Sequence, residues 1–209
     1  MSANLVRRTL ATVAALAAAL VGGVTAAPQV ADAAPGARAV ARTTITFEVP
    51  GCDGCDVWLM QGRWDRHSEY GVRYWDTARK TVSGGTVTYT VPTRHTRGMS
   101  MTVITPWEGH TGYITTVAFR YGGEQVADEV GLAEARSKSK ASACWAGTSA
   151  DRVTIPLTVR KVWVDGFRHH VRGSIAFASV TQEWMVPMRD VWDGVMGSQD
   201  VNVCGERPN

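Results

Sequence analysis

Single apolar and polar residues alternate along several short stretches of this chain, and no other feature restricts its fold as strongly. In residues 43–49, isoleucine, phenylalanine and valine alternate with threonine and glutamate, and residues 152–160 and 171–177 repeat the pattern. A period of two places successive side chains on opposite faces of a β-strand. We therefore expect strands that each bury one face.

The alternation also predicts which side chains face the core. Ile155, Leu157 and Phe177 lie on the apolar sides of their strands, whereas Arg160 and Arg172 lie on the polar sides. A register shift of one residue would reverse all of these assignments. The three apolar side chains should therefore be buried and the two arginines exposed.

Glycine and proline divide the alternating stretches into eight or nine short strands. Ser83-Gly84-Gly85 is typical of a hairpin turn, and Pro156 lacks an N–H donor, which predicts an edge strand or a bulge. Residues 124–141 are rich in Ala, Glu, Lys and Arg, so we expect one short helix there. The pattern predicts a mainly all-β antiparallel β-sandwich. It resembles immunoglobulin-like domains in general architecture but lacks their Cys–Trp–Cys spacing.

The first 34 residues have the features of an export signal. Arg7 and Arg8 precede an apolar run over residues 10–24, and small residues follow up to Ala27 and Ala34. This order is that of a secretory signal peptide, so we expect cleavage after Ala27 or Ala34. The Ala-, Gly- and Val-rich composition is typical of leaders in GC-rich Gram-positive bacteria. The apolar run is shorter than the roughly 20 residues that span a bilayer, so we expect a secreted, extracellular protein without a membrane span.

Cleavage after Ala34 leaves 175 residues, which is enough for one domain with a sizeable core. Residues 35–42 lack periodicity and should form a flexible tail, while residues 43–209 should form a single disulfide-stabilised domain. The whole chain has a net charge of only +3, and no run of Lys or Arg reaches five. A nucleic-acid partner therefore has little electrostatic support.

Four cysteines, Cys52, Cys55, Cys144 and Cys204, allow three disulfide pairings. In an exported chain the two close cysteines most economically bond to each other, which leaves Cys144 to pair with Cys204. Cys52 and Cys55 also have the spacing of a redox or zinc motif. However, Asp53 disfavours a thiolate, and no second close Cys/His pair follows. We interpret the motif as a disulfide across a tight turn.

The sequence contains no diagnostic catalytic, cofactor or metal motif, so we expect neither a cofactor nor a metal. Two polar loops nevertheless combine a histidine with carboxylates. One contains Asp65 and His67, and the other contains Glu108 and His110. Either loop could support acid–base chemistry or hold a metal. The polarity of surface loops explains both without a site.

The eight tryptophans are the clearest indication of function. Trp58 and Trp163 lie in apolar runs, and we expect them in or near the core. Four others lie among polar residues in loops or at strand ends, where exposed rings could stack on sugars or pack on a protein. These candidate ligand-binding residues are Trp64, Trp75, Trp107 and Trp184.

These features favour a secreted, non-enzymatic binding or interaction module whose ligand is a cell-wall carbohydrate or a protein. The alternatives are a secreted hydrolase that uses loop carboxylates and histidines, and a structural protein of the cell envelope. A binding module predicts tryptophans exposed in one patch. A hydrolase predicts a concave pocket that holds at least two interacting titratable groups.

Replacing Cys144 with alanine should lower the free energy of unfolding more than replacing Cys52. In the chain-entropy model, the long ring contributes roughly 4 kcal/mol and the four-residue ring roughly 2 kcal/mol. Thermal melts of Cys144→Ala and Cys52→Ala compare the two bridges directly. Equal losses would contradict the pairing, as would free thiols in the denatured, unreduced parent protein.

Overall fold

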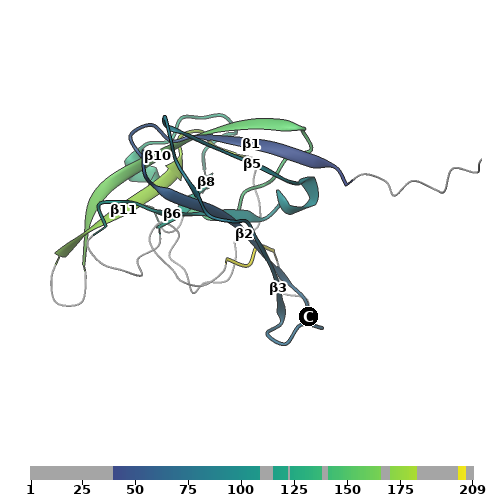
Figure 1. Ribbon diagram of the computed structural model, residues 1–209. Helices are drawn as coiled ribbons and strands as arrows, with labels where there is room; N and C mark the ends of the chain where they lie inside the picture. The colour runs from purple at the N-terminus through teal and green to yellow at the C-terminus, as the bar shows by residue number, and fades with distance from the viewer. Residues whose placement is uncertain are drawn as a thin grey trace, which may run out of the picture. The chain divides into compact units, whose positions relative to one another are not determined.

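In the computed structural model of the protein, nine strands form one sheet, and this sheet curls into a half-barrel (Figure 1). The structure describes residues 40–108, 115–121, 123–137, 141–165, 170–182 and 202–205. The chain divides into two units, Met1–Arg38 and Ala39–Asn209, and all described residues belong to the second. The predicted signal peptide, residues 1–34, therefore lies outside the described residues, as does most of the predicted tail.

The sheet has the strand order β3-β2-β6-β7-β11-β10-β1-β5, and β4 pairs with β2. Two very short strands, β8 and β9, form a separate pair. The strands of the main sheet are β1 (Arg42–Glu48), β2 (Asp56–Trp64), β3 (Val72–Asp76), β4 (Lys80–Thr81), β5 (Thr86–Pro92), β6 (Met99–Ile104), β7 (Thr115–Ala118), β10 (Arg152–Asp165) and β11 (His170–Ala178). The remaining elements are η1 (Thr93–His95), β8 (Arg120–Tyr121), α1 (Leu132–Ala135) and β9 (Ala141–Ser142).

The mainly-β class is confirmed, whereas the sandwich and the immunoglobulin-like arrangement are not. The long strand β10 explains why the sheet is continuous. Residues 152–156 pair in parallel with β1, and residues 157–165 pair antiparallel with β11. β7 and β11 are also parallel, so the sheet is mixed rather than wholly antiparallel.

The missing N–H of Pro156 predicted an edge strand or a bulge. The edge strand is wrong, because β10 lies between β11 and β1 in the sheet. Pro156 stands where β10 changes its pairing partner from β1 to β11, and it forms the last pair of the β1 ladder with Glu48. Its carbonyl accepts the backbone N–H of Ser179 at 3.2 Å. A residue without a donor is tolerated there because one ladder ends and the next begins.

The predicted inner and outer faces are confirmed. Ile155, Leu157 and Phe177 are 0%, 1% and 3% exposed, while Arg160 and Arg172 are exposed. Trp145 is the largest fully buried side chain of the core. On the outer face, threonine side chains of β1 and β5 hydrogen-bond to each other across the two strands. This arrangement follows from the period-two pattern, because one face of each strand packs and the other meets water.

Trp163 is 67% exposed, so its predicted place in the core is wrong. Val159 is 9% exposed, whereas Lys161, the next residue on the same face of β10, is already exposed. The alternation thus continues past the end of the core. The guanidinium of Arg172 lies 5.8 Å from the centre of the Trp163 ring. Trp58 is only partly buried, and the guanidinium of Arg79 covers its ring at 4.5 Å.

The turn at Ser83-Gly84-Gly85 joins the two ends of the sheet rather than two paired strands. Ser83 and Thr86 exchange backbone hydrogen bonds of 3.2 Å, and both glycines have positive φ, as a two-residue turn of this type requires. The predicted turn is confirmed. However, β4 before it pairs with β2, whereas β5 after it pairs with β1. The chain therefore crosses from one end of the curled sheet to the other at this turn.

Both predicted disulfides are formed, Cys52–Cys55 and Cys144–Cys204. The short bridge is fully buried beside the turn, where the Asp53 carboxylate accepts the Gly85 N–H at 2.8 Å. The long bridge ties a segment next to β6 to the C-terminal segment beside β2. Two disulfides indicate an oxidising environment.

The helix expected within residues 124–141 is the single turn α1, whose Ala135 is fully buried. Among the described residues, no helix is long and apolar enough to cross a membrane.

The Tyr89 hydroxyl links β5 to β2 across the interior, because it donates to the Val57 carbonyl at 2.6 Å. Burial raises the pKa of Tyr89 to about 12. The folded pKa exceeds the ordinary value of 10, so the stabilisation is complete below pH 10 and is lost as the pH rises towards 12.

We expect Tyr89→Phe to lower the free energy of unfolding by about 1–2 kcal/mol at pH 7, because the Val57 carbonyl loses its donor. The variant should also lose less stability than the parent between pH 10 and pH 12. Denaturant unfolding at several pH values measures both effects. Tyr74→Phe, at an exposed tyrosine, is the matched control, and an equal effect in that variant would contradict the prediction.

Candidate functional site

The β2–β3 hairpin extends past the strands beside it and forms an arm (Figure 1). β6 pairs with β2 only as far as Gln61, whereas β3 pairs with β2 as far as Trp64. On its other edge β2 is supported by a bridge from Gly62 to Val203. β3 is an edge strand of the sheet. We call residues 62–74 the hairpin arm.

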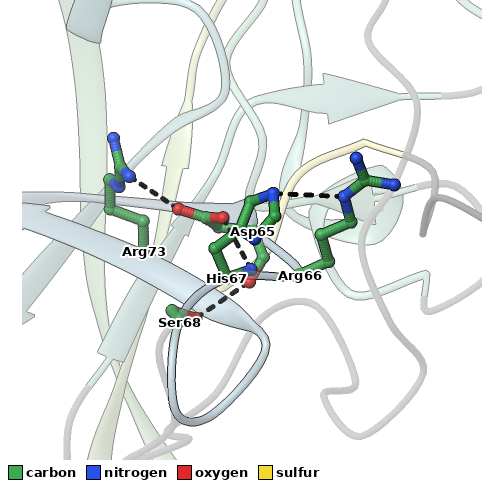
Figure 2. Close-up of polar contacts among 5 residues, drawn as sticks. All are labelled: Asp65, Arg66, His67, Ser68 and Arg73. Carbon is green, nitrogen blue, oxygen red and sulfur yellow. Dashed lines mark hydrogen bonds and ion pairs between the residues drawn. The ribbon is translucent and has the colours of Figure 1, made fainter.

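Asp65 fixes the turn of this arm (Figure 2). Its carboxylate accepts the backbone N–H of His67 at 3.0 Å and forms an ion pair of 2.7 Å with Arg73, while Ser68 donates to its carbonyl. The hydrogen bond from the His67 N–H, and to a lesser extent the charge of Arg73, hold the pKa of Asp65 below its ordinary value. The imidazole of His67 instead accepts a hydrogen bond from Arg66. Asp65 and His67 therefore do not form a side-chain acid–base pair.

One face of the arm carries aromatic side chains. Trp64 pairs with Val72 and Tyr74 with Gly62, so Trp64 and Tyr74 are diagonal neighbours on the same face. Tyr74 is 52% exposed and Trp64 is half-buried, and Tyr70 in the turn is 75% exposed. The indole N–H of Trp64 donates to the Gly205 carbonyl at 3.3 Å, which orients the ring. We call Trp64 and Tyr74 the aromatic face.

On the opposite face, Gln61 connects the arm to the segment after β5. The Gln61 side chain is almost completely buried, and its amide donates to the carbonyls of His95 and Arg97 at 3.2 and 2.7 Å. Its amide oxygen lies 2.8 Å from Nδ1 of His95. Because that oxygen can only accept, Nδ1 of His95 carries a proton. Trp75, the cross-strand partner of Gln61, stacks on the His95 ring with centroids 4.4 Å apart.

His95 is neutral near pH 7. Burial, followed by the charges of Arg94 and Arg63, holds the pKa of His95 below its ordinary value. With the proton on Nδ1, the lone pair on Nε2 is an acceptor. The stacked rings of Trp75 and His95 therefore form a flat, uncharged surface beside Arg63 and Arg94.

Next to this stack lies a hollow of about 460 Å³, which we call the arginine groove. Three exposed arginines line it together with hydroxyl-bearing residues, and no Asp or Glu of the described residues belongs to its lining. Arg63 is held in place, because its Nη2 donates to the carbonyl of Arg94 at 2.7 Å. The lining residues are Arg63, Thr93, Arg94, Thr96, Arg97, Ala146, Gly147, Thr148 and Ser149.

Gly147 brings the last part of this lining into place. It has a φ of +83°, and a Cβ added there would lie 2.6 Å from the backbone nitrogen of Arg97. The loop therefore approaches the Thr96–Arg97 backbone more closely than any other residue would permit. The Thr96 hydroxyl accepts the Thr148 N–H at 3.1 Å and locks this approach.

A second polar site follows β6. Burial raises the pKa of Glu108. Hydrogen bonds from the hydroxyls of Ser174, Thr105 and Thr115 lower it and so offset part of this rise. The Thr115 hydroxyl donates to one carboxyl oxygen of Glu108 at 3.4 Å, whereas the other oxygen has no hydrogen-bond partner among the described residues. The neighbouring indole N–H of Trp107 is also buried without a partner in the described part of the chain. His110, the imidazole expected beside Glu108, lies outside the described residues.

The structure does not gather the predicted ligand-binding tryptophans on one surface. Trp64 and Trp75 lie on opposite faces of the β2–β3 hairpin, as their cross-strand partners show. Trp107 follows β6, whose last residue pairs with Asp56 at the opposite end of β2, roughly 26 Å away along the strand. Trp75 and Trp107 pack against the core and are half-buried. Trp184 lies outside the described residues.

No pattern in the sequence indicates the arginine groove. Its three arginines are separated by 31 and 3 positions along the chain, and none belongs to a basic run. The densest basic stretch, residues 136–140, is elsewhere. Only the pairing of strands brings Arg63 next to Arg94 and Arg97.

Among the described residues, no group of three or more His, Cys, Asp or Glu side chains could hold a metal ion. Comparison with protein-family models, curated proteins and solved structures gives no match to this chain. The site must therefore be interpreted from its own chemistry.

Gly147→Ala should destabilise the protein more than Gly51→Ala. The two glycines have nearly equal φ values, +83° and +79°, so both variants lose roughly 1–2 kcal/mol to left-handed backbone strain. A methyl group at position 51 meets nothing within 4 Å, whereas one at 147 collides with the Arg97 backbone. Thermal melts of the two variants isolate the collision. Equal losses would show that the loop does not pack on Arg97 in this way.

Proposed function

We propose that this protein is a secreted, non-enzymatic binding module that contacts a cell-wall polysaccharide through the aromatic face of its hairpin arm. The observation that carries this proposal is the exposure of Tyr74 beside Trp64 on a projecting edge hairpin. Sugar rings present C–H groups that pack on aromatic rings. Tyrosine and tryptophan also supply a polar atom at the rim of such a contact.

The aromatic face is prepared for binding. The hydrogen bond from Trp64 to Gly205 fixes the indole, and Cys204 next to Gly205 is held by the long disulfide. A side chain that is already ordered loses little conformational entropy when a ligand covers it. The exposed tyrosine beside it adds contact area without requiring a change in the backbone.

Export is the part of the proposal that rests on the leader. Residues 1–34 have the pattern of a signal peptide, with cleavage after Ala27 or Ala34. The two disulfides support an extracellular location, because such bonds persist where the surroundings are oxidising.

The hydrolase alternative has less support. Its two candidate pairs required an imidazole beside a carboxylate, yet the ring of His67 turns to Arg66. Glu108 is half-buried, and the described groups that act on its pKa are hydroxyls and a backbone N–H rather than an imidazole. A structural role in the envelope would not account for the ordered, exposed aromatic side chains on the arm.

Replacing Tyr74 with alanine should weaken binding to a purified cell-wall polysaccharide by about 5- to 30-fold, since one such ring contributes on the order of 1–2 kcal/mol. Tryptophan fluorescence during titration, together with co-sedimentation of the secreted protein with the insoluble polymer, measures the affinity. Trp163→Ala is the matched control, because Trp163 is also exposed (67%, against 52% for Tyr74) but lies on β10. If both variants bind like the parent, the aromatic face is not the contact surface. If a peptide library binds through Tyr74 instead, the ligand is a protein.

A further inference from the structure

Three arginines share the arginine groove, and no described Asp or Glu shares it with them. Arg63, Arg94 and Arg97 are all exposed, and none forms an ion pair with a carboxylate of the described residues. A second hollow of similar volume, beside α1, contains both Glu129 and Arg160 in its lining. Like charges that line one hollow repel each other even in water. The groove therefore accumulates positive charge that no carboxylate of the described residues neutralises.

The cross-strand register adds to this repulsion. Arg63 lies directly opposite Arg73 in the β2–β3 ladder, and like charges in this position destabilise a hairpin. Asp65 neutralises Arg73 with an ion pair of 2.7 Å. No described carboxylate does the same for Arg63. An anion from outside the protein would relieve the repulsion.

One of the three guanidinium groups of the groove is held in place before any ligand arrives. Nη2 of Arg63 donates to the carbonyls of Arg94 and Arg97 at 2.7 and 3.5 Å, so the guanidinium is anchored while its remaining N–H groups have no partner among the described residues. The side chains of Arg94 and Arg97 likewise make no hydrogen bond within the described part of the chain. Exposed hydroxyls, such as that of Ser149, complete the lining.

We propose that the arginine groove binds the phosphate or sulfate groups of an anionic polysaccharide. Arginine is suited to this role because its planar fork donates two parallel hydrogen bonds to an oxyanion. The inference deepens the proposed function, since it assigns the charged groups of the ligand whose sugar rings would contact the aromatic face. Arg63 of the groove belongs to the hairpin arm but lies on the face opposite Trp64 and Tyr74, so a polymer that reaches both surfaces must run over the edge of the arm.

A polysaccharide fits the groove better than a nucleic acid. Binding of single-stranded nucleic acid combines a basic track with aromatic rings that are free to stack on bases. Here one face of the Trp75 ring is already covered by His95, and the three arginines line a single hollow rather than a track. Exposed tyrosines on the arm instead suit sugar rings.

The test compares the secreted parent protein with the double variant Arg94→Gln/Arg97→Gln. Both side chains are exposed and their structural hydrogen bonds are made by the backbone, so the variant should fold normally. Arg152→Gln/Arg160→Gln is the control, because it removes the same charge from exposed positions of β10. The probes are dextran sulfate, a phosphorylated mannan, neutral dextran, inorganic phosphate and a single-stranded oligonucleotide.

The groove variant should bind dextran sulfate or the phosphorylated mannan at least tenfold more weakly than the parent, whereas the control should change less than threefold. The slope of the logarithm of affinity against the logarithm of salt concentration should fall by about 2 in the groove variant. Preference for one of the two polymers identifies sulfate or phosphate as the recognised group. Equal weakening in both variants would overturn the proposal. Tighter binding of the oligonucleotide, or saturation by inorganic phosphate alone, would overturn the choice of a polysaccharide.

The two proposals fail separately. If the groove variant loses binding while Tyr74→Ala does not, the anion site stands and the aromatic contact surface is rejected. If Tyr74→Ala loses binding to an anionic polymer and the groove variant does not, the anion site is rejected.

Discussion

A sheet that curls into a half-barrel keeps its core dry only if its two ends are held together. In this protein, a buried hydrogen bond from the Tyr89 hydroxyl of β5 to the Val57 carbonyl of β2 joins the two ends. The turn at Gly84 and Gly85 carries the chain from the β2 end to the β5 end, and Asp53 secures the turn. Separation of the two ends would expose the largest continuous apolar surface of the described residues.

The same closure builds the candidate site. β5 ends at Pro92, and the chain then turns through η1 and lies against β2 and β3. Gln61 binds the carbonyls of His95 and Arg97, so the segment after β5 is fixed to the base of the hairpin arm. The arginine groove therefore results from the contacts that close the sheet, together with the loop that Gly147 brings against Arg97.

The hairpin arm combines an edge strand with ordered side chains. An exposed edge invites pairing with other chains, and charged residues such as Arg73 and Asp76 on β3 discourage it. The arm can thus present aromatic and basic side chains without offering a free edge for aggregation. Its turn is held by Asp65 and its base by Gln61, so the backbone that carries Arg63, Trp64 and Tyr74 is held in place before binding.

The sequence alone determined the β class, the inward positions of Ile155, Leu157 and Phe177, the turn at Gly84 and both disulfides. These features depend on local periodicity, turn chemistry and the number of cysteines. Only the tertiary structure decided that β10 divides its pairing between two strands, that Trp163 lies beyond the core, and that Trp64 and Trp75 face apart. It also decided that Arg63 meets Arg94 and Arg97. A period of two specifies the two faces of a strand but contains no information about its partner or register. These are set by long-range hydrogen bonding and by the packing of a shared core.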